Sequence, residues 1–524
     1  MQYDILIKNA MIFDGTGARS FRANVIIKNG KIVKIGEAVD DQICEKVINA
    51  DKKFLCPGFI DIQNISDHYL TLLSNPKCEN LIKQGITTIL VGHSGSSLSP
   101  LIKNNLNSFK PWADIENLNV DWRSFKTFLQ FLNTKHLGVN VASLIGWNVM
   151  RNGLIGDHFK NLSDFELKQL LILAKQSMKE GAWGVSFGFG YPSGRAITKR
   201  EILAVHNEIK KFDPLFSFNL RDESNGFIMA LKEILDITRE SKINTLITGM
   251  KVQNADNFVY FEEALKLIDS ANKERNNNIH FTIYPYEYTC RPLITFMPDW
   301  LTIGDEKALR ENLNDKDIVK KLVRELKQNK SFYKKLVLID IDNQYRMLKG
   351  KTFEQIAKNM NLSIEESLVK VMSMTQKKII VLNPNLSSIN IDKGIKHNAS
   401  LVVSHGMSID NHNLNNGFID QRSVGSFVKY LATYKNILSF ETLIHKITGN
   451  VKEVMGLKNK GHIKIGMDAD LVILNVNNLV DRSTIQNAMV DPKGIETVII
   501  NGQVVLDNSQ IIDCQAGKVI VKGN

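Results

Sequence analysis

The sequence predicts an α/β protein built as a (β/α)8 barrel, with a small β-sandwich made from both chain ends and an inserted lid. Three observations support this fold class. Eight apolar runs of strand length alternate with helical stretches through the middle of the 524-residue chain. Both chain ends carry β-branched runs interrupted by Asn-Gly, and one gap between apolar runs is much longer than the others. Eight alternations of strand and helix are typical of a closed parallel barrel.

The two chain ends share a hairpin pattern. Residues 24–33 and 498–505 each place an Asn-Gly pair between β-branched residues, which predicts a type I′ turn. An isolated hairpin is only marginally stable, so such strands need partners that bury their apolar faces. We therefore expect residues 1–56 and 455–524 to form the β-sandwich together.

The barrel is expected to occupy residues 57–454. Its eight predicted strands are 59–64, 87–94, 139–146, 182–189, 215–222, 244–251, 279–286 and 400–406. The long gap before the last strand predicts an inserted unit, which we place at residues 287–345 as a lid over the barrel. In barrels of this kind the functional residues lie at the carboxyl ends of the strands. The residues that follow each predicted strand are therefore the candidates for the site.

Several short blocks of the sequence resemble one enzyme family. QGITT at residues 84–88, YPSGR at 191–195 and ADLV at 469–472 are similar to blocks of the amidohydrolase superfamily, and in particular of the D-aminoacylases and other N-acyl-D-amino-acid deacylases. The resemblance covers nearly the whole chain. It implies an amidohydrolase barrel, zinc as the usual cofactor, and hydrolysis of the C–N bond of linear amides.

The positions that the resemblance assigns to metal binding carry other residues. They are Gln63, Ile65, Ser94, Asn219, Gly249 and His405. At these places the family has histidines, a cysteine and an aspartate. A hydrolytic zinc site needs imidazoles, thiolates or carboxylates aimed at one point. The sequence therefore predicts a metal-site-degenerate member of the family that binds no metal and no other cofactor.

Three residues that follow the predicted strands match a different part of the family site. The resemblance places Lys251, Tyr284 and Arg422 around the carboxylate and acyl parts of the bound substrate. An ammonium, a phenol and a guanidinium can hold a carboxylate by charge-assisted hydrogen bonds. The competing interpretation is that these three residues have ordinary structural roles. The leading hypothesis is a non-hydrolytic pseudoenzyme that binds an N-acyl amino acid or a similar small carboxylate.

Two catalytic hypotheses stay open beside the pseudoenzyme. The first is an active N-acyl-D-amino-acid deacylase, or another C–N hydrolase, as the overall resemblance implies. The second is a metal-independent lyase or isomerase in which His405 is the general base. The histidines at 68, 93 and 405 could also form a new metal site or acid-base pair with Asp61, Asp222 or Glu223. Glu223 is otherwise expected to form a structural ion pair with Arg221.

The charge distribution and the hydropathy narrow the choice of partners. The net charge of +11 comes from 66 basic and 55 acidic residues. The densest basic segment, 316–335, keeps apolar residues at helical spacing, which indicates a solvated helix face rather than a nucleic-acid site. No apolar run is long enough to span a membrane, and no signal-peptide pattern opens the chain. We expect a cytoplasmic protein without membrane contact, and leave open a partner enzyme or a homo-oligomer.

Overall fold

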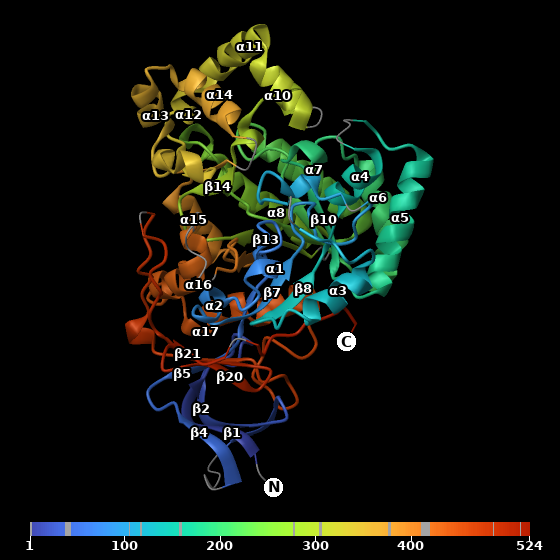
Figure 1. Ribbon diagram of the computed structural model, residues 1–524. Coiled ribbons are helices and arrows are strands. Elements are labelled where there is room, and N and C mark those ends of the chain that lie inside the picture. Colours follow the sequence, from blue (N-terminus) through green and yellow to red (C-terminus); the bar gives the residue numbers. More distant parts are fainter. Residues whose placement is uncertain are drawn as a thin grey trace.

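The computed structural model has a barrel at its centre, with a sheet from both chain ends on one side and an inserted unit on the other (Figure 1). It describes residues 3–36, 43–103, 105–115, 118–156, 160–275, 278–302, 306–375, 379–409, 420–485, 487–513 and 515–523.

The barrel strands confirm the eight predicted runs. They are β6 (Phe59–Asp61), β7 (Ile86–Val91), β8 (Asn140–Ser143), β9 (Ile145–Gly146), β10 (Gly184–Gly188), β11 (Leu215–Asn219), β12 (Asn244–Ile247), β13 (Ile279–Ile283) and β17 (Ser400–Val402). Neighbouring strands pair in parallel, and β8 and β9 both fall in the third run. Two backbone bonds just beyond the strand ends join the eighth run to the first: His405 N to Gln63 O at 3.1 Å, and Ile65 N to Gly406 O at 2.8 Å. These bonds close the barrel.

Helices surround the barrel because each buries one apolar face against the strands. They are α1 (Thr71–Ser74), α2 (Glu79–Ile82), α3 (Phe125–Asn133), α4 (Trp147–Ile155), α5 (Asp164–Lys179), α6 (Lys199–Ile209), α7 (Phe227–Ser241), α8 (Tyr260–Arg275), α15 (Ser388–Lys396), α16 (Gln421–Tyr434), α17 (Phe440–Ile447) and α18 (Gly449–Met455). Helix α5 shows how the sequence sets a boundary. Ser163 and Glu166 form a capping box at its start, and Leu167, Leu170 and Ala174 lie on its buried face.

The chain ends build one nine-stranded sheet. Its members are β1 (Tyr3–Ile12), β2 (Phe21–Lys28), β3 (Lys31–Gly36), β4 (Cys44–Asn49), β5 (Phe54–Pro57), β18 (Leu471–Leu474), β19 (Ile495–Ile500), β20 (Gln503–Asp507) and β21 (Gln510–Ile511). The two halves meet where β18 pairs antiparallel with β5. Leu471 and Ile473 pack in a small core of this sheet, whereas Val472 and Leu474 join the large apolar cluster of the barrel. Strand β18 is therefore buried on both faces, and the domain borders at 56 and 455 stay predictions.

Both predicted hairpin turns are confirmed. Asn29 and Gly30 have φ values of 51° and 73°, and Asn501 and Gly502 have φ values of 49° and 80°. Positive φ at both central residues is the requirement of a type I′ turn. The two turns also touch, because a Cβ added to Gly502 would lie 2.5 Å from Gly30 Cα. The hairpins from the two chain ends are thus packed together through their glycines.

The inserted unit lies between β13 and β17. It contains β14 (Thr289–Pro292), α9 (Asp299–Thr302), α10 (Glu306–Asn314), α11 (Lys316–Leu326), α12 (Lys330–Tyr333), β15 (Val337–Asp340), α13 (Phe353–Met360), α14 (Ile364–Met374) and β16 (Ile380–Asn383). It has its own apolar cluster, which includes Leu293, Leu322 and Phe353. The unit extends beyond the expected end at residue 345, because β16 is the central strand of its three-stranded sheet. Its action as a lid stays a prediction.

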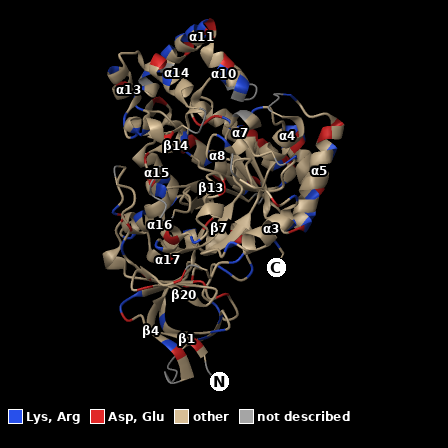
Figure 2. Ribbon diagram, viewed as in Figure 1, with Lys and Arg blue, Asp and Glu red and all other residues tan. Residues whose placement is uncertain are grey.

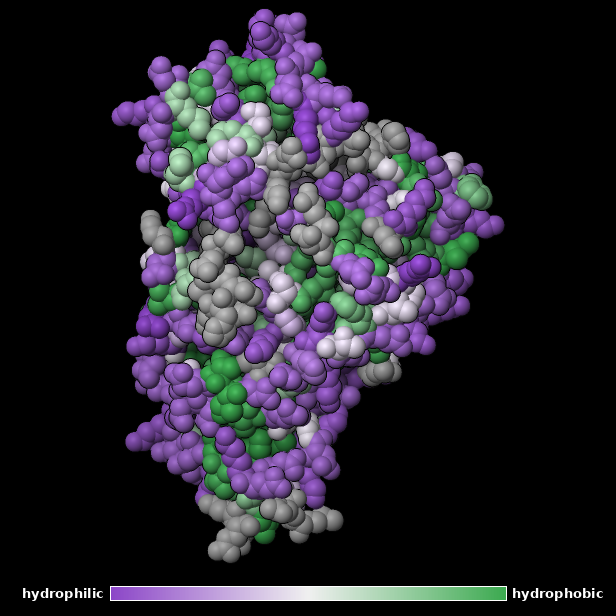
Figure 3. Space-filling view, viewed as in Figure 1, coloured by the Kyte–Doolittle hydropathy of each residue, from purple (hydrophilic) through white to green (hydrophobic). Residues whose placement is uncertain are grey.

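The surface shows no concentration of one charge in the views drawn. Lys and Arg alternate with Asp and Glu along α5 and α11 (Figure 2), and hydrophilic side chains cover much of the face in Figure 3. Within the described ranges, no helix is long and apolar enough to cross a membrane. The expected absence of a nucleic-acid partner, the cytoplasmic location and any homo-oligomer stay predictions.

Candidate functional site

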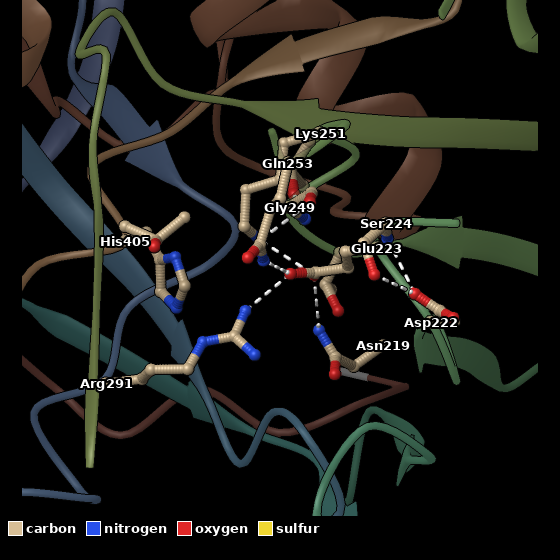
Figure 4. A network of polar contacts seen from close by, with 12 residues as sticks. Asn219, Asp222, Glu223, Ser224, Gly249, Lys251, Gln253, Arg291 and His405 are labelled. Atoms are coloured by element: carbon tan, nitrogen blue, oxygen red, sulfur yellow. Dashed lines mark hydrogen bonds and ion pairs between the residues drawn. The ribbon is translucent and has the colours of Figure 1, made fainter. Parts of the chain in front are cut away.

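Four polar side chains converge on Glu223, which follows β11 at the end of the barrel that we call the mouth (Figure 4). Lys251 Nζ lies 2.8 Å from Glu223 Oε1, and Arg291 Nη2 lies 2.5 Å from Glu223 Oε2. The Gln253 amide also donates to Oε2, and Asn219 Nδ2 lies 3.5 Å from Oε1. The single carboxylate of Glu223 therefore accepts hydrogen bonds from two cationic and two amide side chains.

The Glu223 group is nearly closed to solvent. The exposed fractions of the side chains are 6% for Glu223, 9% for Lys251 and 19% for Arg291. Burial raises the pKa of Glu223, but the two neighbouring cations lower it further, so the net shift is downward. Burial lowers the pKa of Lys251, and the guanidiniums of Arg291 and Arg422 act in the same direction. The carboxylate is stabilised in its ionised form.

A second ion pair lies beside the first. Arg422, at the start of α16, places Nε 2.6 Å from Asp420 Oδ2, and Tyr288 donates its hydroxyl to Asp420 Oδ1 at 2.7 Å. The Arg422 side chain is 1% exposed. Its guanidinium lies over the Tyr284 ring, 4.8 Å from the centroid. Arg422 is therefore held by Asp420 on one side and by an aromatic face on the other.

Tyr284 contributes a ring face to the mouth rather than a free hydroxyl. Its hydroxyl donates to the backbone oxygen of Tyr288 at 2.9 Å. Its ring centroid lies 5.7 Å from that of His405. The structure thus brings Lys251, Tyr284 and Arg422 into one region, where each already has a protein partner; their role in substrate binding stays a prediction.

His405 is a neutral hydrogen-bond donor in this arrangement. Burial lowers its pKa well below the usual value, and Arg422 and Lys251 add to the effect. Arg422 Nη1 lies 3.3 Å from His405 Nδ1. Since a guanidinium only donates, Nδ1 accepts and the ring proton sits on Nε2. His405 therefore has no free lone pair with which to act as a base.

Both ring nitrogens of His93 also have hydrogen-bond partners. Its Nε2 lies 3.2 Å from the backbone oxygen of Leu90, and its Nδ1 lies 3.1 Å from Ser217 Oγ. A carbonyl only accepts, so Nε2 carries the proton and Nδ1 accepts from Ser217. Burial lowers the pKa of His93 to about 4. Neither ring nitrogen is available to a metal ion.

His68 differs from the other two histidines. Its Nδ1 lies 2.9 Å from Asp67 Oδ1, and Asp67 Oδ2 accepts from Gly92 N at 2.8 Å. The ionised carboxylate requires Nδ1 to donate, which leaves the lone pair on Nε2. The ring packs edge-on against Trp112, with centroids 5.6 Å apart. Among the three histidines considered, only His68 keeps a basic nitrogen.

The carboxylates that were candidates for a new metal site or acid-base pair already accept hydrogen bonds from nearby groups. Asp61 accepts from Ser404 N at 3.1 Å and from Asn64 Nδ2 at 3.0 Å, and burial raises its pKa to about 6. Asp222 accepts from the backbone of Ser224 at 2.6 Å. The expected pairing of Glu223 with Arg221 is wrong. Arg221 turns outward, where its Nη2 lies 2.8 Å from Glu233 Oε1 on α7.

The residues that the sequence resemblance assigns to metal binding are engaged in other contacts, and their side chains are not those of a zinc site. Gln63 Oε1 accepts from the Thr282 hydroxyl at 2.5 Å, and Ile65 packs in an apolar cluster with Met407 and Val424. A Cβ added to Gly249 would lie 2.8 Å from Lys251 Nζ, so the ammonium fills the space of a side chain there. Within the described ranges, no group of three His, Cys, Asp or Glu side chains is placed to hold a metal ion.

Sequence reasoning missed three members of the mouth: Gln253, Arg291 and Asp420. Arg291 lies on β14, and only the folding of the inserted unit brings it to Glu223. Gln253 and Asp420 lie within two residues of Lys251 and Arg422. Their short sequence distance from two cations was the available signal, because buried cations need nearby acceptors.

A small apolar cavity adjoins the mouth. Its volume is about 20 Å³, and its wall includes Lys251, Tyr284, Phe261, Ile283 and Ile391. It lies between the barrel strands and the helices α8 and α15. This space holds about one water molecule.

Comparisons with known proteins agree with the barrel and extend over the whole chain. A profile of the amidohydrolase family matches residues 412–506. An N-acyl-D-aspartate deacylase of Alcaligenes xylosoxydans xylosoxydans is 25% identical over 100% of this chain and 96% of its own length. A D-aminoacylase of the same organism is 24% identical over 99% of this chain and 98% of its own length.

A solved structure supports the same fold. The N-acyl-D-glutamate deacylase of Bordetella bronchiseptica, complexed with zinc and a phosphonate inhibitor, aligns with a TM-score of 0.84 and 21% identity, covering 99% of this chain and 100% of its own. The solved structure shows that this chain has the fold of an amidohydrolase barrel. In sequence, the chain is similar over its whole length to D-aminoacylases and N-acyl-D-amino-acid deacylases.

Proposed function

We propose that this chain is a non-hydrolytic member of the D-aminoacylase family that binds an N-acyl amino acid or a similar carboxylate at the barrel mouth. One observation carries the proposal. Gln63, Ser94, Asn219 and Gly249, which the resemblance assigns to metal binding, are buried, and the cations Lys251 and Arg422 lie in the same region of the barrel.

The chemistry of amide hydrolysis explains why these replacements matter. A metal ion supplies the hydroxide nucleophile at neutral pH by lowering the pKa of a bound water. The residues assigned to metal binding offer amides and a hydroxyl, and the lone pairs of His93 and His405 are already used. Recognition of a carboxylate needs only cations and donors, which are present. Binding is thus the activity that this set of side chains supports best.

Metal content together with activity tests this proposal. The purified protein should contain less than one tenth of an equivalent of zinc and should not deacylate N-acetyl-D-amino acids, with or without added zinc. The alternative is an active N-acyl-D-amino-acid deacylase. Stoichiometric zinc together with chelator-sensitive deacylation would establish that alternative and reject the pseudoenzyme.

A metal-independent lyase or isomerase is a second candidate, and the Asp67–His68 pair is what favours it. A carboxylate-oriented imidazole with a basic Nε2 is a standard proton acceptor. His405, the base expected from the sequence, would act instead as a donor through Nε2. We would assay a panel of N-acyl amino acids for α-deuterium incorporation in D2O, using His68→Asn and His405→Asn beside the parent. Deuterium incorporation that occurs in the parent and in His405→Asn but not in His68→Asn supports this candidate. Absence of deuterium incorporation in the parent rejects it.

A further inference from the structure

The two ion-pair groups of the mouth differ in net charge. Arg422 is matched by Asp420, so their formal charges cancel. In the other group Lys251 and Arg291 share the single carboxylate of Glu223, which leaves one positive charge in excess. Among the described residues, these contacts assign the excess to Lys251 and Arg291. A buried unmatched cation is unfavourable, and an anionic ligand would remove the penalty.

Arg291 is the most open of the three cations. Its side chain is 19% exposed, compared with 9% for Lys251 and 1% for Arg422. Among the described residues, it bonds to Glu223 through Nη2, and a guanidinium has five N–H donors. Arg422 donates from Nε and Nη2 to Asp420 and from Nη1 to His405. Arg291 therefore has the greater capacity to take up a further acceptor.

We propose that Arg291, with Lys251, binds the anionic group of the ligand, and that the mouth is matched to a ligand with a single negative charge. This inference rests on the proposed carboxylate-binding function and specifies its ligand as a monoanion. Arg422 is then a positioning residue that holds Asp420 and the tautomer of His405. One ligand anion brings the formal charge of the Glu223 group to zero, and a second anion would reverse its sign.

The position of Arg291 also links the ligand to the inserted unit. Arg291 lies on β14, where it pairs with Val381 of β16, the central strand of the insert sheet. Glu223 belongs to the barrel. A ligand held jointly by Arg291 and Lys251 therefore connects the insert with the barrel, and its binding should stabilise β14 and β16.

Three probes test the charge preference by calorimetry and thermal shift. N-acetylglycine carries one negative charge, N-acetylglycinamide carries none, and N-acetyl-D-aspartate carries two. The wild-type protein should bind N-acetylglycine at least about tenfold more tightly than either other probe, since a charge-assisted pair in a buried site is worth that factor or more. Arg291→Gln should remove the preference for N-acetylglycine over the amide, and Arg291→Lys should retain part of it.

A matched control and a second readout separate binding from folding. Lys320→Gln removes the same charge from the insert at an exposed site and should bind all probes as the wild type does. Hydrogen exchange in β14 and β16 should slow with N-acetylglycine in the wild type and not in Arg291→Gln.

Absence of binding by any probe to the wild type would reject the proposed function itself. Equal binding of N-acetylglycine by Arg291→Gln, or tighter binding of the dianion, would reject this inference alone.

Discussion

At the scale of single residues, the chemistry available at the mouth depends on which side-chain atoms already have hydrogen-bond partners. His93 and His405 were both candidates for metal or acid-base chemistry, yet their ring nitrogens already bond to Leu90, Ser217 and Arg422. Histidine content alone therefore says little about a metal site. The partner of each ring nitrogen decides whether the side chain is a ligand, a base or a donor.

Removal of the Glu223 carboxylate should destabilise the fold. In Glu223→Gln the buried cations Lys251 and Arg291 lose their counter-ion, and breaking a buried pair in this way costs about 3 kcal/mol or more. The free energy of unfolding from urea titration at pH 7 measures the loss. Glu233→Gln is the control, because Glu233 pairs with Arg221 at a part-exposed site and should cost less than about 1 kcal/mol. Equal losses in the two variants would contradict the central role of Glu223.

His93 should make the protein sensitive to acid. Its pKa is lowered by burial from the ordinary 6.5 to about 4, so the unfolded chain takes up the proton first. The stabilising contribution is complete above pH 6.5 and is lost as the pH falls through 4, by up to about 3 kcal/mol.

Urea titrations at pH 7 and pH 4.5 test the contribution of His93. His93→Gln keeps one donor and one acceptor but cannot be protonated in this range. Its unfolding free energy should therefore fall less on acidification than that of the wild type. The exposed His136→Gln should follow the wild type. An unchanged acid response in His93→Gln would contradict the assignment.

At the scale of elements, the contact between the two hairpin turns holds the chain ends together. Both turns use Asn-Gly at positive φ, and Gly502 approaches Gly30 so closely that a methyl group has no room. Short strands from opposite ends of the chain gain stability by this packing and by the pairing of β18 with β5. The terminal sheet therefore depends on residues almost 500 positions apart.

Gly502→Ala should destabilise the terminal sheet more than Gly466→Ala. Both glycines have positive φ, 80° and 89°, so both variants carry the backbone strain of about 1 kcal/mol. The Gly502 methyl would also lie 2.5 Å from Gly30 Cα, whereas that of Gly466 meets nothing within 4 Å. Thermal unfolding should show an extra loss of about 1–3 kcal/mol for Gly502→Ala. Equal melting temperatures would mean that the two turns do not touch.

At the scale of the whole molecule, the fold holds its mouth together with protein contacts. Two ion pairs and the Gln63–Thr282 bond join side chains from different strands of the barrel and from the insert. These contacts involve Gln63 and neighbours of Gly249, which the sequence resemblance assigns to metal binding. The stability of the barrel should accordingly be independent of added metal.

A chelator should leave the melting temperature of the purified protein unchanged within about 1 °C. A ligand that binds only the folded state raises its stability by mass action, and its removal lowers it. Differential scanning calorimetry with and without excess EDTA, and again with added zinc, measures the effect. A fall of several degrees with EDTA, restored by zinc, would reveal a structural metal ion and oppose the proposal.

The sequence by itself determined the architecture, and its resemblance to a known family gave the hypothesis that the metal positions are replaced. Apolar periodicity predicted every barrel strand, and Asn-Gly predicted both hairpin turns, because these signals are local and depend on neighbouring residues alone. Gln63, Ser94 and Gly249 were identified from the blocks that flank them.

Only the tertiary structure decided how charges and lone pairs are shared at the mouth. Arg291 reaches Glu223 from an insert whose placement no local pattern specifies, and Asp420 takes up Arg422, which the sequence had assigned to the ligand. Ion pairing is short-ranged and depends on side chains from distant segments meeting within a few ångströms. That proximity arises only when the chain folds. In the folded chain Asp420 neutralises Arg422, whereas Lys251 and Arg291 share the single carboxylate of Glu223.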